Sequence, residues 1–161
     1  MAIAKRRKKF FEVEIPFLKR EVPLQAYEIS ELDGRLIRYD LTRLLRGKGS
    51  VLSLKVSVDG HEAVATPFKM VVLPYYIKRM MRTGTNYVED SFSVECADAV
   101  VRVKPFLITR RKVSRAVRKA LRNKCKEEIS EKIKDKSFEE VLSELFKGTL
   151  QRQIAIVLKK I

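Results

Sequence analysis

The chain has 161 residues and a mass of 18.7 kDa, which suits one domain able to bury a hydrophobic core. Its 35 Lys and Arg exceed its 20 Asp and Glu and leave a formal charge of +15, while 45% hydrophobic residues argue against wholesale disorder. This charge points first to nucleic acid, second to an anionic membrane surface, and away from most small-molecule enzymes.

The first nine residues read as a basic tail. Five consecutive cations repel one another there unless they are spread along an anion. They are Lys5, Arg6, Arg7, Lys8 and Lys9. After this tail (1–9) we expect a single α+β RNA-binding domain over 10–161, rich in strands over 10–108 and helical over 110–161.

Alternation of apolar and polar residues predicts strands over 11–15 and 35–39. Between them, Pro16 and Pro23 bracket a connection, and 25–29 is a short candidate strand. The segment that follows them in the chain has the clearest signal of a hairpin.

A hairpin is predicted where 52–58 and 61–66 alternate on either side of Asp59-Gly60, because an Asp-Gly pair suits a tight turn. Pro74 then favours the first turn of a helix that runs to about Arg82.

A second hairpin is predicted to pair 87–96 with 99–108. Its inward side chains include Phe92 and Val94, whereas Arg102 and Lys104 fall on the opposite face, turned to solvent or to a ligand.

Helices follow this hairpin. Apolar residues at spacings of three and four predict one stripe on the first of them. The stripe comprises Val113, Ala116, Val117, Ala120, Leu121, Cys125 and Ile129. A capping box at Ser137–Glu140 opens the next helix, Gly148 ends it, and a last helix starts at Thr149. Strands followed by helices predict an α+β fold: a small, bent antiparallel β-sheet or barrel-like core with flanking helices and a helical C-terminal third.

Charge is concentrated between residues 102 and 126, where eleven cations occur without any Asp or Glu. Most basic faces are simply solvated, but the lack of compensating acids favours a ligand here. We expect RNA phosphates to contact most of these cations, with Arg79 and Arg82 as additions. The candidates are Arg102, Lys104, Arg110, Arg111, Lys112, Arg115, Arg118, Lys119, Arg122 and Lys126.

The sequence contains little that indicates catalysis or sequence-specific recognition of nucleic-acid bases. His61 is the single histidine and follows the Asp-Gly turn, and the Glu12/Glu14 pair has no partner for proton transfer. We find neither a P-loop nor a dinucleotide fingerprint nor a zinc-finger spacing. The sequence therefore predicts that the protein is not an enzyme and has no metal, cofactor or small-molecule substrate. We expect it to recognise RNA by its shape and through contacts with its phosphates.

Cys96 and Cys125 are too few for a disulfide framework and are expected to be small buried side chains. No apolar stretch approaches the roughly 20 residues that span a bilayer, and the N-terminus lacks the apolar core of a signal peptide. We expect a soluble, cytoplasmic protein. A peripheral membrane protein is the least favoured alternative, because the stripe opposite the cations is rich in Ala and Val.

Several segments together resemble one family. They are KFFEVEIPF, GRLIRYDLTRLL, LSLKVSVDGHEAVATPF, the helix over 74–82, and TNYVEDSFSVECADAVVRVKPFLITRRKVSRAVRKALRNK. In this order they are similar to the archaeal and eukaryotic small-subunit ribosomal protein family S3Ae, also called eS1, and the length favours an archaeal source.

The resemblance implies a structural constituent of the small ribosomal subunit, located on the platform near the rRNA 3′ end and the mRNA exit. It also implies contacts of the basic strand–helix segment and the basic tail with small-subunit rRNA, and contacts with neighbouring small-subunit ribosomal proteins. The alternative is a free-standing RNA-binding or translation-associated factor of the same fold.

Overall fold

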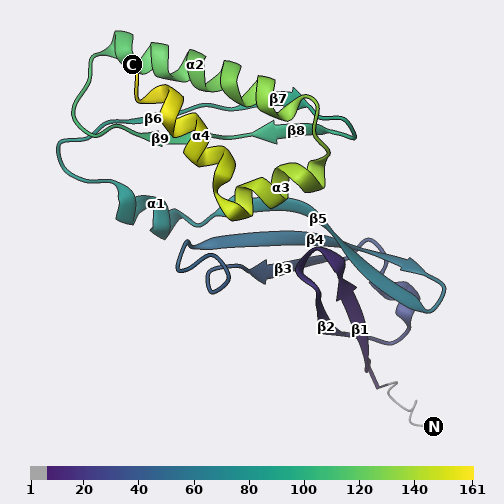
Figure 1. Ribbon diagram of the computed structural model, residues 1–161. Helices are drawn as coiled ribbons and strands as arrows, with labels where there is room; N and C mark the ends of the chain where they lie inside the picture. Colours follow the sequence, from purple (N-terminus) through teal and green to yellow (C-terminus); the bar gives the residue numbers. More distant parts are fainter. Residues whose placement is uncertain (1–6) are drawn as a thin grey trace. The chain divides into compact units, whose positions relative to one another are not determined.

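The computed structural model describes residues 7–161, so Lys5 and Arg6 of the predicted tail lie outside the described residues (Figure 1). The fold is α+β with a helical C-terminal part, as predicted. The chain divides into two compact units, the first ending at Tyr76 and the second running from Ile77 to Ile161. That 10–161 acts as one domain stays a prediction.

The first unit is built on a five-stranded sheet that curls into a half-barrel (Figure 1). The strand order is β2-β1-β5-β4-β3, antiparallel throughout except for the parallel pair β1–β5. The strands are β1 (Lys9–Ile15), β2 (Arg20–Ala26), β3 (Leu36–Asp40), β4 (Ser50–Asp59) and β5 (Glu62–Val72). Two short 3-10 turns, Pro16–Leu18 and Ile29–Leu32, lie between the first three strands.

The predicted strand over 25–29 is wrong. Instead β2 begins at Arg20 and includes Pro23, which lies opposite Glu12 of β1. A proline is tolerated here because β2 is the edge strand of the sheet, so the missing N–H removes no hydrogen bond from a central ladder.

The hairpin of β4 and β5 confirms the prediction from Asp59-Gly60, since Gly60 takes a φ of +63° in the turn. The second strand continues well past its predicted end. Ser53 pairs with Lys69 and Leu54 with Pro67, so Phe68 is the extra residue of a β-bulge. The bulge lets β5 pass a proline and keep the alternation of faces on both sides.

The core of this unit lies inside the curled sheet. Alternate residues of the central strands face it and are fully or almost fully buried. They are Val13, Ile15, Leu52, Leu54, Val56, Ala63 and Ala65, with Leu32, Leu41 and Leu45 from the connections.

The second unit consists of a long hairpin and the helices that cover one of its faces. Helix α1 (Pro74–Met80) contains the boundary between the units. The hairpin strands are β6 (Tyr87–Glu89), β7 (Phe92–Glu95), β8 (Val100–Val103) and β9 (Phe106–Ile108). The helices are α2 (Arg115–Ile133), α3 (Phe138–Lys147) and α4 (Thr149–Leu158).

The predicted hairpin is confirmed but is interrupted once on each side. At the open end of the hairpin β6 pairs with β9, and next to its turn β7 pairs with β8. Pro105 lies in the interruption, where its missing N–H cannot join the ladder, and its carbonyl accepts a hydrogen bond from the Asp90 backbone N at 3.4 Å. Inward and outward positions nevertheless alternate continuously along both strands.

The three helices and the hairpin share one hydrophobic core. Its buried members are Phe92, Val94, Cys125, Ile129, Ile133, Val141, Leu150 and Ile154. The predicted stripe on α2 is partly wrong, because Ala116 and Ala120 are exposed. The observed stripe follows a spacing of four through Val117, Leu121 and Cys125, along the side of α2 that contacts the hairpin and α4.

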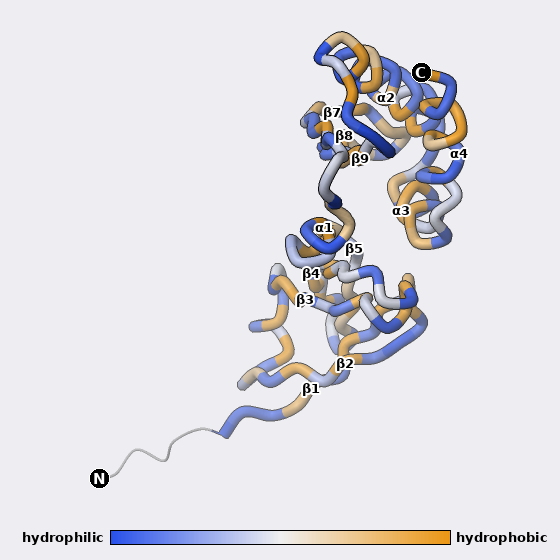
Figure 2. Tube along the Cα trace, turned by 90° about the vertical axis from the view of Figure 1, so that its left-hand side faces the viewer, coloured by the Kyte–Doolittle hydropathy of each residue, from blue (hydrophilic) through white to orange (hydrophobic). Residues whose placement is uncertain are grey.

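Hydrophilic and hydrophobic residues are interleaved along α2, α3 and α4 (Figure 2). Within residues 7–161, the structure contains no helix with the length and apolar character that a membrane crossing requires.

Candidate nucleic-acid interface

Ser114 starts the most basic helix of the chain. Its hydroxyl oxygen accepts a hydrogen bond from the backbone N of Val117 at 3.4 Å, which is the N-cap arrangement. The first turn of α2 contains no acidic residue and carries Arg115 and Arg118. Cations at a helix N-terminus face the positive end of the helix dipole, so an anion bound there relieves repulsion.

The loop before α2 presents three exposed cations, Arg110, Arg111 and Lys112. Hydrogen bonds of two residues, Thr109 and Asn86, hold this loop in place. The Thr109 hydroxyl accepts a hydrogen bond from the Asn86 backbone N at 2.9 Å and lies 2.7 Å from the carbonyl oxygen of Arg111. The Asn86 side chain accepts a bond from the backbone N of Val113.

Asn86 and Thr109 were absent from the predicted site. Their partners lie 23 and 27 positions away in the sequence, so no local signal marks them. They hold the backbone that carries the cations and do not contribute charge themselves.

Five of the seven cations of α2 lie in two rows with a spacing of four. Arg115 and Lys119 form an exposed row. Arg118, Arg122 and Lys126 form a second row beside the buried stripe, along the hairpin strands that α2 contacts.

The second row touches the hairpin through its side chains. The Nε of Arg122 donates to the Glu89 carbonyl oxygen at 3.4 Å, and the Nζ of Lys126 lies 5.8 Å from the centre of the Phe92 ring. The Nε of Arg118 is buried without a hydrogen-bond partner among the described residues. Arg118 is therefore half-buried and only partly available to an external ligand.

Lys124 differs from its neighbours. Its Nζ lies 3.4 Å from Glu127 Oε2 and 3.4 Å from Glu128 Oε1, and hydrogen bonds to these carboxylates raise its pKa. For the other ten cations of 102–126, the described residues supply no ion pair with a carboxylate. Ten positive charges thus remain for an external anion.

Arg102 and Lys104 are exposed, as predicted, but they lie on a different side of the hairpin from the two rows of cations on α2. The Cα of Arg102 pairs with Ser93 on the outer face of the hairpin, whereas α2 packs on the inner face with Phe92 and Val94. The structure therefore divides the cations of this segment between two sides of the hairpin.

The remaining predicted cations lie elsewhere. Arg7 and Lys8 precede the sheet, with the Nζ of Lys8 5.5 Å from the centre of the Tyr27 ring, and Lys9 is already the first residue of β1. Arg79 in α1 and Arg82 just after it are exposed.

Sequence reasoning missed three further cations that the five-stranded sheet brings together. Arg38 and Lys69 both flank Ser53 on its outer face, and Lys55 lies in the next row. Their 32-residue span hides this grouping in the sequence, and only strand register reveals it.

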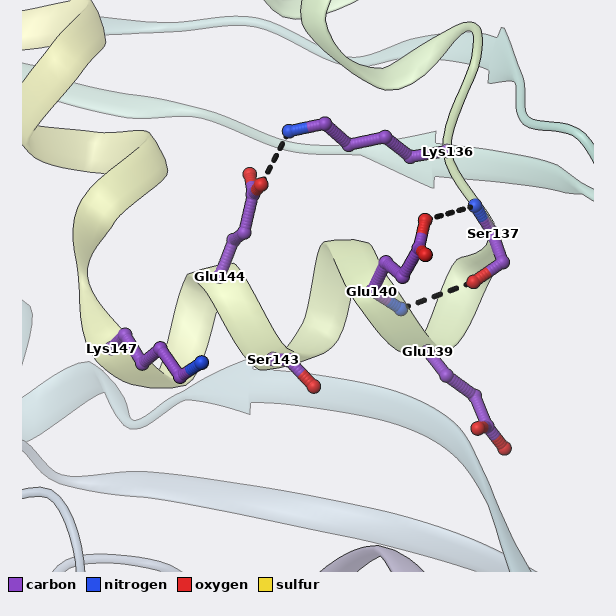
Figure 3. Close-up of a pocket in the computed structure, with 7 residues that line it drawn as sticks. All are labelled: Lys136, Ser137, Glu139, Glu140, Ser143, Glu144 and Lys147. Atoms are coloured by element: carbon purple, nitrogen blue, oxygen red, sulfur yellow. Dashed lines mark hydrogen bonds and ion pairs between the residues drawn. The ribbon is translucent and has the colours of Figure 1, made fainter.

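Other polar clusters have structural roles. In the depression at α3, Lys136 forms an ion pair with Glu144, and Ser137 and Glu140 exchange the two hydrogen bonds of the predicted capping box (Figure 3). Glu12 and Glu14 share the outer face of β1, as predicted, and His61 is exposed at its turn. Over the described range, no three His, Cys, Asp or Glu side chains form a group that could hold a metal ion.

The two cysteines are free thiols. Cys125 is buried and Cys96 is half-buried, so the expectation of buried side chains holds fully only for Cys125. Burial raises the pKa of Cys125 to about 11, with the Asp90 carboxylate adding to the effect. A neutral buried thiol is a packing group and not a nucleophile at neutral pH.

Comparison with known proteins gives two findings. The model of the Ribosomal S3Ae family matches residues 5–161. The small ribosomal subunit protein eS1 of Nanoarchaeum equitans (strain Kin4-M) is 28% identical, and the alignment covers 97% of this chain and 83% of that protein.

Proposed function

The chain belongs to the ribosomal S3Ae family, and from this premise we propose that its cationic segment 102–126 and its basic tail bind small-subunit rRNA. As a member of a ribosomal structural protein family, it is a small-ribosomal-subunit protein and its family is not one of enzymes. We place it on the platform near the rRNA 3′ end and the mRNA exit, in contact with neighbouring ribosomal proteins in the cytoplasm. The S3Ae resemblance supports that placement.

One observation carries the rRNA proposal. Ten cations between residues 102 and 126 have no carboxylate partner among the residues that the structure describes. Outside this segment and the tail, the other 19 Lys and Arg nearly balance the 20 acids. The excess charge is thus local, which suits a docking surface better than general solubility.

Phosphates explain why such a surface is stable. Like charges at a spacing of four destabilise an isolated helix by about 0.2–0.5 kcal/mol per pair, and bound phosphates remove this repulsion while counterions are released. The fastened loop 110–113 and the capped start of α2 hold the cations in fixed positions, so little order has to be created on binding.

The salt dependence of binding tests this proposal. In the variant Arg115→Gln/Arg118→Gln/Arg122→Gln, affinity for small-subunit rRNA is expected to fall, and the slope of log affinity against log salt to flatten by about 0.7–0.9 per lost phosphate contact. The matched control replaces exposed Lys134, Lys159 and Lys160 by Gln and removes the same net charge. An identical slope change in both variants would contradict the assignment to α2.

Sedimentation separates a resident subunit protein from a free-standing factor. A resident protein remains with small subunits in equimolar amount after a high-salt wash, because it is embedded among rRNA and protein contacts. Release from the subunit by the wash would favour the free-standing factor.

A further inference from the structure

The outer face of the second-unit hairpin carries two aromatic rings that the proposed phosphate surface does not use. The rings of Tyr87 and Phe106 are stacked, with their centres 5.7 Å apart and 14° between their planes. The register pairs Tyr87 with Ile108 and Glu89 with Phe106, so the two rings are diagonal neighbours.

Tyr87 is 54% exposed although it belongs to a strand. The core side of the same strand is supplied by Val88, which is 3% exposed, and the partner strand contributes Leu107. The ring of Tyr87 is therefore held by Phe106 on one side and open on another, and it is not needed to close the core.

Cations lie close to this ring. Lys104 and Arg102 occupy the same outer face of the hairpin, farther along the strand that carries Phe106. Lys104 is two residues from Phe106 and so about 7 Å away along the strand, whereas Arg122 belongs to α2 on the inner face and reaches only the backbone carbonyl of Glu89. An aromatic face with cations within one or two residues is the arrangement that holds single-stranded nucleic acid.

We propose that the Tyr87–Phe106 pair is a stacking platform for an unpaired RNA base, with the flanking phosphates held by Lys104 and Arg102 of the same face. This inference rests on the proposed RNA-binding function and adds to it the class of RNA that this face takes. An unpaired nucleotide is required because the bases of a duplex are stacked on one another and offer no free ring face to a tyrosine.

Glu89 fixes which part of the nucleotide lies there. Its exposed side chain is beside Phe106 on the same face, so its carboxylate repels phosphate and can accept hydrogen bonds from the amino group of a base. The RNA base is therefore expected over the cross-strand pair of Glu89 and Phe106. The sugar–phosphate backbone of the RNA is expected over the neighbouring positions of the hairpin that carry cations.

The experiment compares Tyr87→Leu, which keeps an apolar side chain but removes the aromatic face, with the control Tyr87→Phe, which keeps it. Two probes are titrated separately: an unstructured 12-nucleotide RNA with one 2-aminopurine, and an RNA duplex of equal length. Tyr87→Leu is expected to weaken single-strand binding about five-fold or more and duplex binding less than two-fold. Tyr87→Phe retains wild-type affinity and quenching of 2-aminopurine.

Unchanged single-strand affinity of Tyr87→Leu, or an equal loss for both probes, overturns the stacking platform. If the triple Gln variant on α2 still loses rRNA binding in that case, the proposed function stands without the platform. If the unaltered protein binds neither probe in a salt-dependent way, the proposed function itself has failed. Equal thermal unfolding curves of the Leu and Phe variants show that any difference comes from the ring.

Discussion

The Oδ1 of Asn86 accepts a hydrogen bond of 2.9 Å from the backbone N of Val113, across 27 positions of sequence. Together with Thr109, this bond ties the basic loop to the segment that precedes β6. A neutral side chain thus determines where the loop cations are presented.

Replacing Asn86 by Ala is expected to lower the free energy of unfolding by about 1–2 kcal/mol, because a part-buried backbone N–H loses its acceptor. The variant is also expected to bind rRNA more weakly although no charge is removed. Denaturant unfolding measures the first effect and titration of rRNA the second, while hydrogen exchange at 110–113 reports whether the loop has loosened. The matched control is Asn123→Ala at an exposed position of α2, where little change is expected in either quantity.

Removing Lys124 is expected to affect RNA binding less than removing Arg122. The Lys124 ammonium is engaged by Glu127 and Glu128, and its replacement by Gln frees two carboxylates that repel phosphate only at the edge of the surface. Arg122 has no carboxylate partner among the described residues and is available to phosphate. Titration of rRNA into each single Gln variant at two salt concentrations ranks the two positions. A larger slope change for Lys124→Gln would contradict the pairing argument.

The capping box of α3 is expected to contribute to stability without taking part in binding. In Ser137→Ala the backbone N of Glu140 loses the hydroxyl acceptor, which costs about 1 kcal/mol of folding free energy. Thermal unfolding should show this loss, whereas Ser143→Ala on the same helix should be close to neutral. The affinity for rRNA is expected to be unchanged in both variants.

Cys125 makes the folding stability of the second unit depend on pH in the alkaline range. Its pKa is raised from 9.0 to about 11 in the folded protein by burial, so the unfolded chain releases this proton first as the pH rises. The stability present below pH 9.0 is therefore lost progressively between 9.0 and about 11, by about 2–3 kcal/mol.

Urea unfolding at several pH values tests this dependence. Cys125→Ala is expected to be less stable at neutral pH because it leaves a small cavity, but its stability should fall less steeply between pH 9 and 11. A parallel decline in the two proteins would show that other groups cause the loss.

Local signals predicted much of the fold correctly. The Asp59-Gly60 turn, the Ser137 capping box and the hairpin over 87–108 all depend on residues that interact with near neighbours or with an alternating partner strand. Each is read from spacing alone, since the relevant backbone geometry is set within a few residues.

Errors arose where a distant element decides the environment. Pro23 was predicted to bracket a connection, but it lies within a strand because that strand is at the edge of the sheet. Ala120 matched the helical period of the buried stripe but is exposed, because the hairpin and α4 pack against the side of α2 that carries Cys125 and Ile129. Arg102 matched the basic segment, yet the hairpin places it on the face opposite α2.

The sequence by itself determined the α+β class, the amount of excess charge and the segment that contains it, because composition and short-range periodicity are properties of the chain. The tertiary structure alone decided which cations share a face and how the loop that carries Arg110, Arg111 and Lys112 is held. Strand register brings Arg38 and Lys69 to the two sides of Ser53, and a hydrogen bond joins Asn86 to Val113, in each case across 27 or more positions. Long-range pairing of this kind leaves no periodic trace in the sequence, because it depends on the positions of elements and not on the residues within one.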